Sequence, residues 1–305
     1  YGSALQYFTG SKEHNIVTRK IAISKKLKLN EYGVFKGKKM IAGWSEKGVY
    51  KAIGLPWIEP ELRENRGETN AALEGRLPKL VELKDIKGDL HCHSSWDGGV
   101  NSILELAEAA LEKNYQYLGI ADHTKFLRIE QGLDEKKLTR QRKEIDKLNL
   151  KFRKKFKILQ GAETNILNDG SVDIKDEALK RLDYAIAGVH SSFKMPREKM
   201  TERVIRTMKN PYIKILSHPT GRILKRRDEY QIDFDKILRA AKQFKVILEV
   251  NSCPERLDLN DINIKKAIEV GVKLIINTDS HHRDQLSIWD SVLLKLGEAG
   301  PRKRI

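Results

Sequence analysis

From Asp89 onward the chain alternates seven times between a short apolar run and a longer amphipathic run. The apolar runs cover 90–95, 117–124, 157–166, 184–192, 213–221, 246–253 and 273–282, and the amphipathic runs that follow them cover 102–114, 137–155, 173–182, 197–210, 234–244, 262–270 and 287–300. Continuous apolar runs are typical of buried parallel strands, and apolar residues at i, i+3, i+4 and i+7 are typical of helices. Seven βα units in a row predict an α/β barrel of the TIM kind or a close variant. A doubly wound open sheet is the alternative, but no glycine-rich dinucleotide turn supports it.

Polar residues that can bind metal ions stand where the predicted strands end. They are His91 and His93, Asp122 and His123, Glu163, His190, His218, Glu249 and Asn251, and Asp279, His281 and His282. Seven of the eight histidines belong to this set, and His14 is the exception. An isolated His-x-His motif such as His91 and His93 would more often lie at the exposed tip of a hairpin. In a barrel, however, all strand C-termini meet on one face, so we expect these side chains to converge there.

The converging groups are imidazoles and carboxylates, with no thiolate among them. This mixture suits catalytic Zn²⁺, Mn²⁺ or Fe²⁺ better than a structural zinc site. The groups are too many for one ion, so we expect two or three divalent ions, with Glu163 as the bridging ligand. Such clusters activate water and clamp the oxygens of a phosphoryl group. The pattern therefore predicts hydrolysis of a phosphate ester.

Charge and cysteine content narrow the partners and the compartment. The formal net charge is +16, which favours a polyanionic partner such as nucleic acid. Enrichment in lysine and glutamate is, however, also common in proteins of thermophilic organisms. The two cysteines, Cys92 and Cys253, are far apart and form no CxxC motif, which fits a reducing cytoplasm. No apolar run approaches a membrane span, and the first residues do not look like a signal peptide.

The motifs GDLHCHSSWDGG, GIADHT, GAETNI, GVHSS, ILSHPTGR and NTDSHH resemble the polymerase-and-histidinol-phosphatase (PHP) domain. The resemblance implies a distorted TIM-like (β/α)7 barrel with a trinuclear metal centre. The ligands that it implies are His91, His93, Asp97, His123, Glu163, His190, His218, Asp279 and His281. Relatives often read WSDG where this chain reads WDGG. Either a loop shift therefore brings Asp97 to the metals, or one metal binds weakly.

The first part of the chain resembles the thumb of bacterial and archaeal family X DNA polymerases, on the stretches YGSALQYFTGSKEHNIVTRKIA, LKLNEYGVF and IGLPWIEPELRENRGETNAA. We expect the thumb over 1–55, a linker over 56–87 and the PHP domain over 88–305. The residues that would face an incoming nucleotide or DNA are Tyr7, Phe8, Gly10, Ser11, Asn15 and Arg19. Without the downstream motif, Tyr7 and Phe8 would more simply pack a helix junction.

No carboxylate cluster for nucleotidyl transfer precedes the barrel, and the chain begins at Tyr1 in mid-subdomain. We therefore expect the C-terminal part of a DNA-directed polymerase, which does not polymerise without the palm. The family implies a 3′–5′ exonuclease, with 3′-end processing or abasic-site cleavage in base excision repair. Its partners would be single-stranded or gapped DNA and the polymerase palm and fingers.

The resemblance also suggests roles within the centre. His91, His93, Glu163 and Asp279 would hold one metal, His190 and the bridging Glu163 a second, and His123, His218, His281 and Asp97 would complete the set. Glu163 and Asp279 would be catalytic, and Arg222 or Lys125 would neutralise the phosphate, unless these two are solvated loop charges. His282 is expected to lie behind the ligands or at the surface rather than to bind metal, and 225–227 form a basic patch that either binds phosphates or is a solvated face. The alternatives are a histidinol-phosphate type phosphatase and a catalytically silent metal-binding scaffold for the polymerase.

Overall fold

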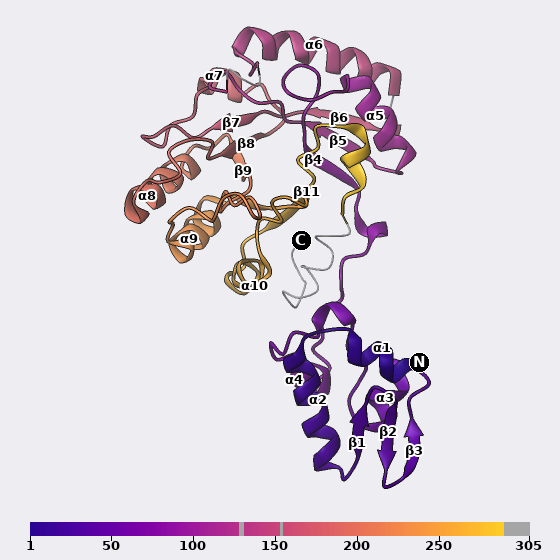
Figure 1. Cartoon of the computed structure of the whole chain (residues 1–305). Helices are drawn as coiled ribbons and strands as arrows, with labels where there is room; N and C mark the ends of the chain where they lie inside the picture. The colour runs from indigo at the N-terminus through magenta and orange to yellow at the C-terminus, as the bar shows by residue number, and fades with distance from the viewer. Residues whose placement is uncertain (128–130, 153–154, 290–305) are drawn as a thin grey trace. The chain divides into compact units, whose positions relative to one another are not determined.

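The computed structural model describes residues 1–127, 131–152 and 155–289. It divides into two compact units, one of Tyr1–Val81 and one that begins at Glu82 (Figure 1). Each unit has its own hydrophobic core. Within the described residues, no helix is long and apolar enough to cross a membrane.

The first unit combines short helices with a three-stranded antiparallel sheet. Its elements are α1 (Gly2–Phe8), α2 (Lys12–Ser24), β1 (Lys28–Asn30), β2 (Gly33–Lys36), β3 (Lys39–Ala42), α3 (Glu46–Ala52), the 3-10 turn η1 (Pro60–Leu62) and α4 (Glu68–Leu73). Ser11 and Ser45 begin α2 and α3 by accepting a backbone N–H with their hydroxyl groups. The sequence thus places a serine N-cap at the start of both helices.

The core of the first unit extends into the segment expected to be a linker. Val34, Val49 and Ile53 form its centre, and Ile58 and Leu62 are buried against them. The structure therefore differs from the expected boundaries of 1–55 and 56–87, because residues as far as Val81 pack with this unit. Apolar side chains of the connector cover core surface that the short sheet and helices leave open. The turn η2 (Leu83–Asp85) precedes the next strand.

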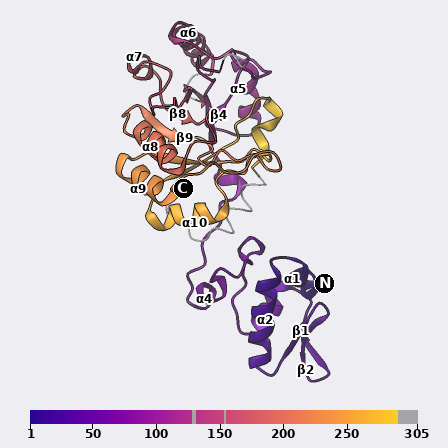
Figure 2. The same cartoon turned by 60° about the vertical axis from the view of Figure 1, so that its left-hand side comes forward.

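The second unit alternates strands and helices in the predicted order, except that the run expected to be one strand over 157–166 forms two strands with no helix between them. Its strands are β4 (Gly88–Cys92), β5 (Tyr117–Ile120), β6 (Lys157–Gln160), β7 (Glu163–Asn165), β8 (Ala185–Gly188), β9 (Ile213–Leu216), β10 (Ile247–Asn251) and β11 (Leu274–Asn277). Its helices are α5 (Ile103–Glu112), α6 (Glu135–Phe152), α7 (Asp176–Leu179), α8 (Arg197–Met208), α9 (Phe234–Phe244), α10 (Asp261–Val270) and the 3-10 turn η4 (Arg283–Ser287). The run expected to be a helix over 287–300 lies mostly outside the described residues. Figures 1 and 2 show the long helices outside the strands.

The strands are parallel and form two sheets, β4-β5-β6 and β11-β10-β9-β8-β7. Isolated parallel bridges run between them, from Cys92 to Ser280 and from His123 to Glu163. The α/β class with parallel strands is thus confirmed, while the hydrogen-bond ladder is split into two parts. An apolar cluster of Tyr184, Ile186 and Ile215 lies between the strands, together with partly buried side chains from β4, β6, β10 and β11.

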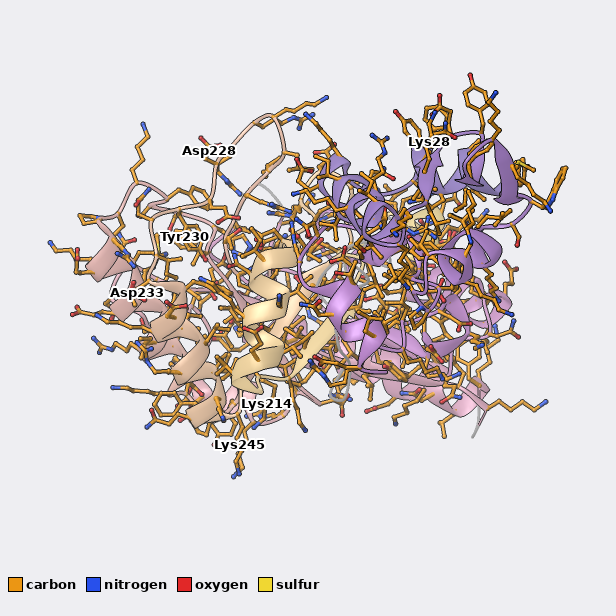
Figure 3. The ribbon with its side chains drawn as sticks, turned by 90° about the horizontal axis from the view of Figure 1, so that it is seen from below. Lys28, Lys214, Asp228, Tyr230, Asp233 and Lys245 are labelled. Atoms are coloured by element: carbon orange, nitrogen blue, oxygen red, sulfur yellow. The ribbon has the colours of Figure 1, made fainter. Side chains whose placement is uncertain are left out.

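Because the strands are parallel, their carboxyl ends lie on the same side of the second unit. Figure 3 shows Lys214 at the start of β9 and Lys245 just before β10 on one side. Asp228 and Tyr230, in the segment that follows β9, lie on the opposite side. Residues at strand ends can therefore meet around one site.

Candidate metal centre

The site begins with two imidazoles at the end of β4. His91 and His93 lie on the same face with ring centroids 5.2 Å apart. The N–H of His93 donates to the carbonyl of Ser280 at 2.8 Å, which ties this strand end to the residues that follow β11. The His91 Nε2 is 3.5 Å and the His93 Nε2 is 3.3 Å from Asp279 Oδ1.

The carboxylate of Glu163 lies between two sets of imidazoles. Its Oε2 is 3.2 Å from His91 Nε2 and 3.1 Å from His123 Nδ1. Its Oε1 is 3.3 Å from His190 Nε2 and 2.8 Å from His218 Nε2. One oxygen therefore faces each set, which is the geometry of a carboxylate that can bridge two ions.

Several buried nitrogen atoms at this centre have no hydrogen-bond partner in the protein. They include Nε2 of His91 and His93, Nδ1 of His123 and Nε2 of His190. A buried polar atom without a partner is costly, so each nitrogen needs a ligand. Ligands about 2.1 Å from one ion are separated by roughly 3 to 3.5 Å. The separations measured here are of that size, so the side chains fit divalent cations.

Four groups of described side chains bring possible ligand atoms within 4.8 Å of one another: His91, His93, Glu163 and Asp279; His123, Glu163 and His190; His93, His123 and His281; and His93, Asp97 and Asp122. The first two groups share Glu163. The structure therefore brings together all nine residues that the resemblance named as ligands, if His218 is included through its contact with Glu163.

Two carboxylates stand behind the imidazoles rather than between them. Asp97 Oδ2 is 2.8 Å from His93 Nδ1, and it also accepts the backbone N–H of His123. Glu249 Oε1 is 2.7 Å from His91 Nδ1. Such partners fix the tautomer and the orientation of a metal-binding imidazole. The structure thus places Asp97 where it orients ligands. Glu249 has the same kind of position, and from the sequence it was noted at a strand end but was not included in the site.

The two histidines after β11 differ in position. His281 stacks on His93 with ring centroids 4.2 Å apart and keeps 39% of its side chain exposed. His282 instead begins η4, because its side chain accepts the N–H of Asp284. His282 is in none of the four groups, and its side chain is 40% exposed.

Opposite charges offset the cost of burial at the centre. Burial disfavours the charged form of Glu163, but imidazoles such as His91 and His190 outweigh it and hold the pKa of Glu163 well below its usual value. Burial also opposes a charged His91, yet the neighbouring carboxylates raise its pKa well above normal. Burial lowers the pKa of His123 to about 3, so this imidazole is neutral and its lone pair is available.

The backbone around the site is held in uncommon conformations. His218 and Asp279 have φ values of 28° and 56°, in a region that residues other than glycine seldom adopt. Such strain clusters at functional sites. At Gly188 a Cβ atom would lie 2.8 Å from Glu163 Oε1 and 2.7 Å from His190, so only glycine leaves room for both side chains.

The arginine at the centre is Arg256 and not Arg222. Arg256 Nε is 3.2 Å from Asp279 Oδ2, and its Nη1 is buried without a partner. Arg222 donates instead to the backbone carbonyls of Arg256 and Leu257. The expected role of Arg222 at the phosphate stays a prediction, and its Nε and Nη2 are engaged by these carbonyl groups. Lys125 pairs with Glu135 at 2.9 Å, and its side chain is partly exposed.

In the first unit, Tyr7 and Phe8 end α1. Phe8 is 77% exposed, and Tyr7 lies under Arg19, whose guanidinium carbon is 5.1 Å from the ring centroid. The carboxamide of Asn15 is buried, and it donates to the carbonyl of Tyr7 and accepts from Gln6. Asn15 therefore fixes Tyr7, while Phe8 and Arg19 remain accessible in part.

The turn after Phe8 is held by a buried arginine that sequence reasoning missed. Gly10 has a φ of 85°, and Ser11 donates its N–H to the carbonyl of Arg63 at 2.7 Å. The guanidinium of Arg63 is fully buried and bonds to Thr9 and Glu46. Arg63 therefore holds the turn over residues 9–11 in place. Nothing in the local sequence distinguishes Arg63 from the exposed charges of a polar connector.

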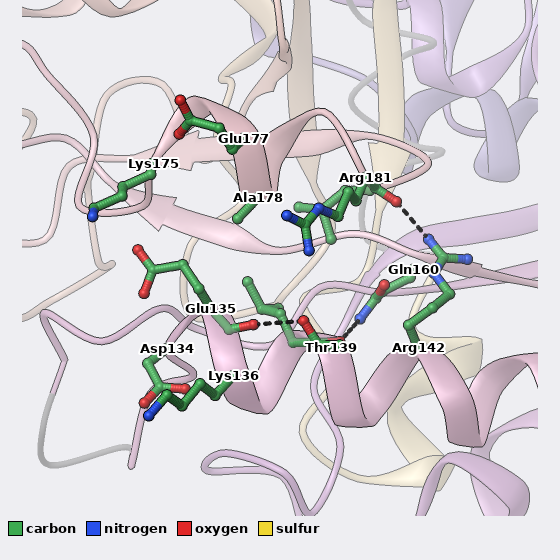
Figure 4. A pocket seen from close by; sticks show the side chains of 12 residues that line it. Asp134, Glu135, Lys136, Thr139, Arg142, Gln160, Lys175, Glu177, Ala178 and Arg181 are labelled. Carbon is green, nitrogen blue, oxygen red and sulfur yellow. Dashed lines mark hydrogen bonds between the residues drawn. The ribbon is translucent and has the colours of Figure 1, made fainter.

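A separate cavity of about 580 Å³ lies between α6 and α7 (Figure 4). Its charged wall includes Lys175, Glu177 and Arg181. Arg142 in the same wall is engaged by Asp183 and by the carbonyl of Arg181. The cavity contains none of the candidate ligands, so the chemistry of the metal centre is not performed there.

Comparison with known families divides the chain in the same way. The profile of the DNA polymerase beta thumb matches residues 4–64, and the profile of the PHP domain matches residues 89–253, which is more than half of the chain. The chain is 42% identical over 288 residues to the DNA polymerase/3′-5′ exonuclease PolX of Bacillus subtilis (strain 168). That match covers 94% of this chain and 50% of the relative, so the chain spans about half of the relative's length.

Among solved structures, the chain resembles histidinol phosphate phosphatase from Lactococcus lactis, crystallised with zinc, L-histidinol and phosphate. The TM-score is 0.54 at 18% identity, and the match covers 72% of this chain and 95% of the other. At this identity the match shows a shared fold. The PHP fold that the sequence motifs predict is thus confirmed.

Proposed function

The chain belongs to the PHP domain family, and from this premise we propose that it hydrolyses DNA phosphodiester bonds from the 3′ end, as a 3′–5′ exonuclease. The proposal rests on the position of the Glu163 carboxylate. One of its oxygens faces His91 and His123, and the other faces His190 and His218. A carboxylate between two sets of imidazoles, in which His91 Nε2, His123 Nδ1 and His190 Nε2 have no hydrogen-bond partner, suits two-metal hydrolysis of a phosphate ester.

The ions that we propose are two or three divalent cations, Zn²⁺ and/or Mn²⁺. Imidazole and carboxylate ligands without thiolate favour these ions. His91, His93, Glu163 and Asp279 would hold one ion, and Glu163 with His123 and His190 a second. His93, His123 and His281 would serve a third, with Asp97 fixing the ring of His93.

Bound divalent ions would act as Lewis acids and make water a better nucleophile. In the overall reaction, water gives its hydroxyl group to phosphorus and its proton to the 3′ oxygen, as the bond between phosphorus and that oxygen breaks. The residues of the chain supply the geometry. Glu249 and Asp97 hold the rings of His91 and His93 in one orientation, and Arg256 adds positive charge beside Asp279.

The DNA substrate is supported by the first unit and by the charge of the chain. The thumb profile covers Tyr7, Phe8, Gly10, Ser11, Asn15 and Arg19, which we propose as contacts to nucleotide and DNA. The net charge of +16 favours binding of a polyanion. We further propose that the chain acts with a polymerase palm and fingers, as in a PolX protein, on single-stranded or gapped DNA 3′ ends during base excision repair in the cytoplasm.

Digestion of a 5′-labelled oligonucleotide tests the proposal. Single-stranded and gapped substrates are incubated with Mn²⁺ or Zn²⁺, with and without a chelator. We expect shortening from the 3′ end that the chelator stops and that Glu163→Ala abolishes, while the exposed control Arg239→Gln on α9 retains wild-type activity. Digestion that survives Glu163→Ala would contradict the assignment. Bound metal without any hydrolysis would favour a silent scaffold.

A small-molecule phosphatase is the second candidate, because the fold is shared with the Lactococcus lactis enzyme. The same preparation is therefore assayed with histidinol phosphate. Faster release of phosphate from histidinol phosphate than of nucleotides from DNA would favour this alternative.

A further inference from the structure

A pocket of about 400 Å³ lies beside the metal centre. Two candidate ligands, Asp279 and His281, form part of its wall, so the pocket borders the centre itself. Ile223, Pro254 and Ile288 supply apolar surface. Polar groups from Arg256, Thr278 and Gln285 share the wall with these apolar side chains, and such a mixed wall suits a ligand with both an apolar and a polar part.

Arg256 stands where this pocket meets the metal centre. It lines the pocket, while its Nε lies 3.2 Å from Asp279 Oδ2. Its Nη1 is buried and has no partner in the protein, so one donor is left to receive a ligand. A guanidinium matches the oxygens of a phosphate group better than any other side chain.

Two loops fix Arg256 in this position. Its backbone N–H donates to the carbonyl of Cys253, and its own carbonyl accepts from Arg222 Nε at 2.9 Å. The N–H of Leu224 donates to the carbonyl of Glu255, which joins the loop after β9 to the loop after β10. The carboxylate of Glu255 also lines the pocket, but Arg226 pairs with it at 3.4 Å. The site is therefore built before any ligand arrives.

We propose that this pocket holds the terminal nucleoside of the DNA 3′ end and that Arg256 Nη1 donates to the phosphate on its 5′ oxygen. The proposal rests on the exonuclease function above and names a subsite for it. Water adds to that phosphorus, so the phosphate stays on the departing nucleotide. The product that fits both the pocket and Arg256 is a nucleoside 5′-monophosphate.

Calorimetric binding of deoxyadenosine 5′-monophosphate and of inorganic phosphate to the metal-loaded chain tests the subsite. We expect the wild type to bind the nucleotide at least tenfold more tightly than phosphate. Arg256→Gln should weaken both ligands at least tenfold, with Arg256→Lys intermediate. Ile223→Trp, which fills the pocket, should remove the advantage of the nucleotide and leave phosphate binding unchanged. Arg239→Gln is the matched control on α9.

Metal content and thermal unfolding are measured on every variant, so that a ligand effect is separated from misfolding. Wild-type phosphate binding by Arg256→Gln would overturn the role of Arg256, and so would loss of bound metal in that variant. Unchanged nucleotide binding by Ile223→Trp would place the nucleoside elsewhere. If the wild type binds the nucleotide but does not digest DNA, the exonuclease function fails while the subsite stands.

Discussion

At the scale of single residues, the metal centre depends on the carboxylates that stand behind the imidazoles. Glu249 accepts the backbone N–H of His218 and lies 2.7 Å from His91 Nδ1, which leaves His91 Nε2 facing Glu163. An imidazole carries one proton when neutral, so a partner on Nδ1 decides that the lone pair is on Nε2. Glu249 therefore acts on the metals through His91.

Replacing Glu249 tests this indirect role. In Glu249→Gln the amide can either accept a hydrogen bond from His91 Nδ1 or donate one to it, so it no longer selects one tautomer of the ring. We therefore expect metal affinity to fall about 10- to 100-fold. Competition with a chromogenic chelator measures the affinity, and Glu269→Gln, an exposed glutamate on α10, is the control. Activity should return when the metal concentration is raised. Loss that added metal does not restore would show that Glu249 is needed for more than the orientation of His91.

Residue types at strand ends indicated many of the side chains that converge, because parallel strands end on the same side of the unit, while the full ligand set was implied by the resemblance to the PHP domain. The sequence could not predict which arginine faces the centre. Arg222 follows a ligand motif closely, yet its donors are taken by the carbonyls of Arg256 and Leu257. That outcome depends on how two loops meet, and no local pattern carries this information. The position of Asp97 behind His93 depends on loop geometry in the same way.

At the scale of elements, α4 is tied to the rest of the first unit by the buried carboxylate of Glu68. It accepts the backbone N–H groups of Asn65 and Arg66 and lies 2.5 Å from His14 Nδ1 on α2. Burial opposes the charged form of Glu68, but the hydrogen bonds from His14 and the backbone lower its pKa below the usual value. The charged carboxylate is therefore a link between α4 and α2.

A lowered pKa in the folded state gives this link a definite pH dependence. An unfolded glutamate titrates near pH 4.3, so the contribution of Glu68 is complete above that value and is lost as pH falls through its folded pKa. We expect Glu68→Gln to cost about 1–3 kcal/mol at pH 7 and less at pH 3. Calorimetric unfolding at both pH values measures this, with the exposed Glu74→Gln as control. An equal cost at both pH values would refute a role for the charge.

The alternation of strands and helices could be predicted from the sequence because each apolar run is long and regular. The packing of the connector could not. Its residues read as polar and proline-containing, yet Ile58, Leu62 and Ala72 are buried in the first unit. Few and irregularly spaced apolar residues give no periodicity, so their burial becomes visible only in the tertiary structure.

At the scale of the whole molecule, the two units have separate cores, and only the second contains the candidate ligands among the described residues. A ligand that binds only the folded state stabilises it by about 4 kcal/mol at a thousand times its dissociation constant. For a unit of this size, that corresponds to a rise in melting temperature of about 8–16 °C.

Removal of metal should therefore act on one unit alone. In a calorimetric scan of the metal-loaded chain, we expect a chelator to lower the transition of the second unit by about 10 °C and to leave the first unchanged. Glu163→Ala should melt at the lower temperature with or without chelator, because the residue between the two sets of imidazoles is missing. A single transition that the chelator lowers would mean that the two units unfold as one. No shift in the wild type would mean that the buried nitrogens of His91, His93 and His190 hold no ion, and the metal centre would then be refuted.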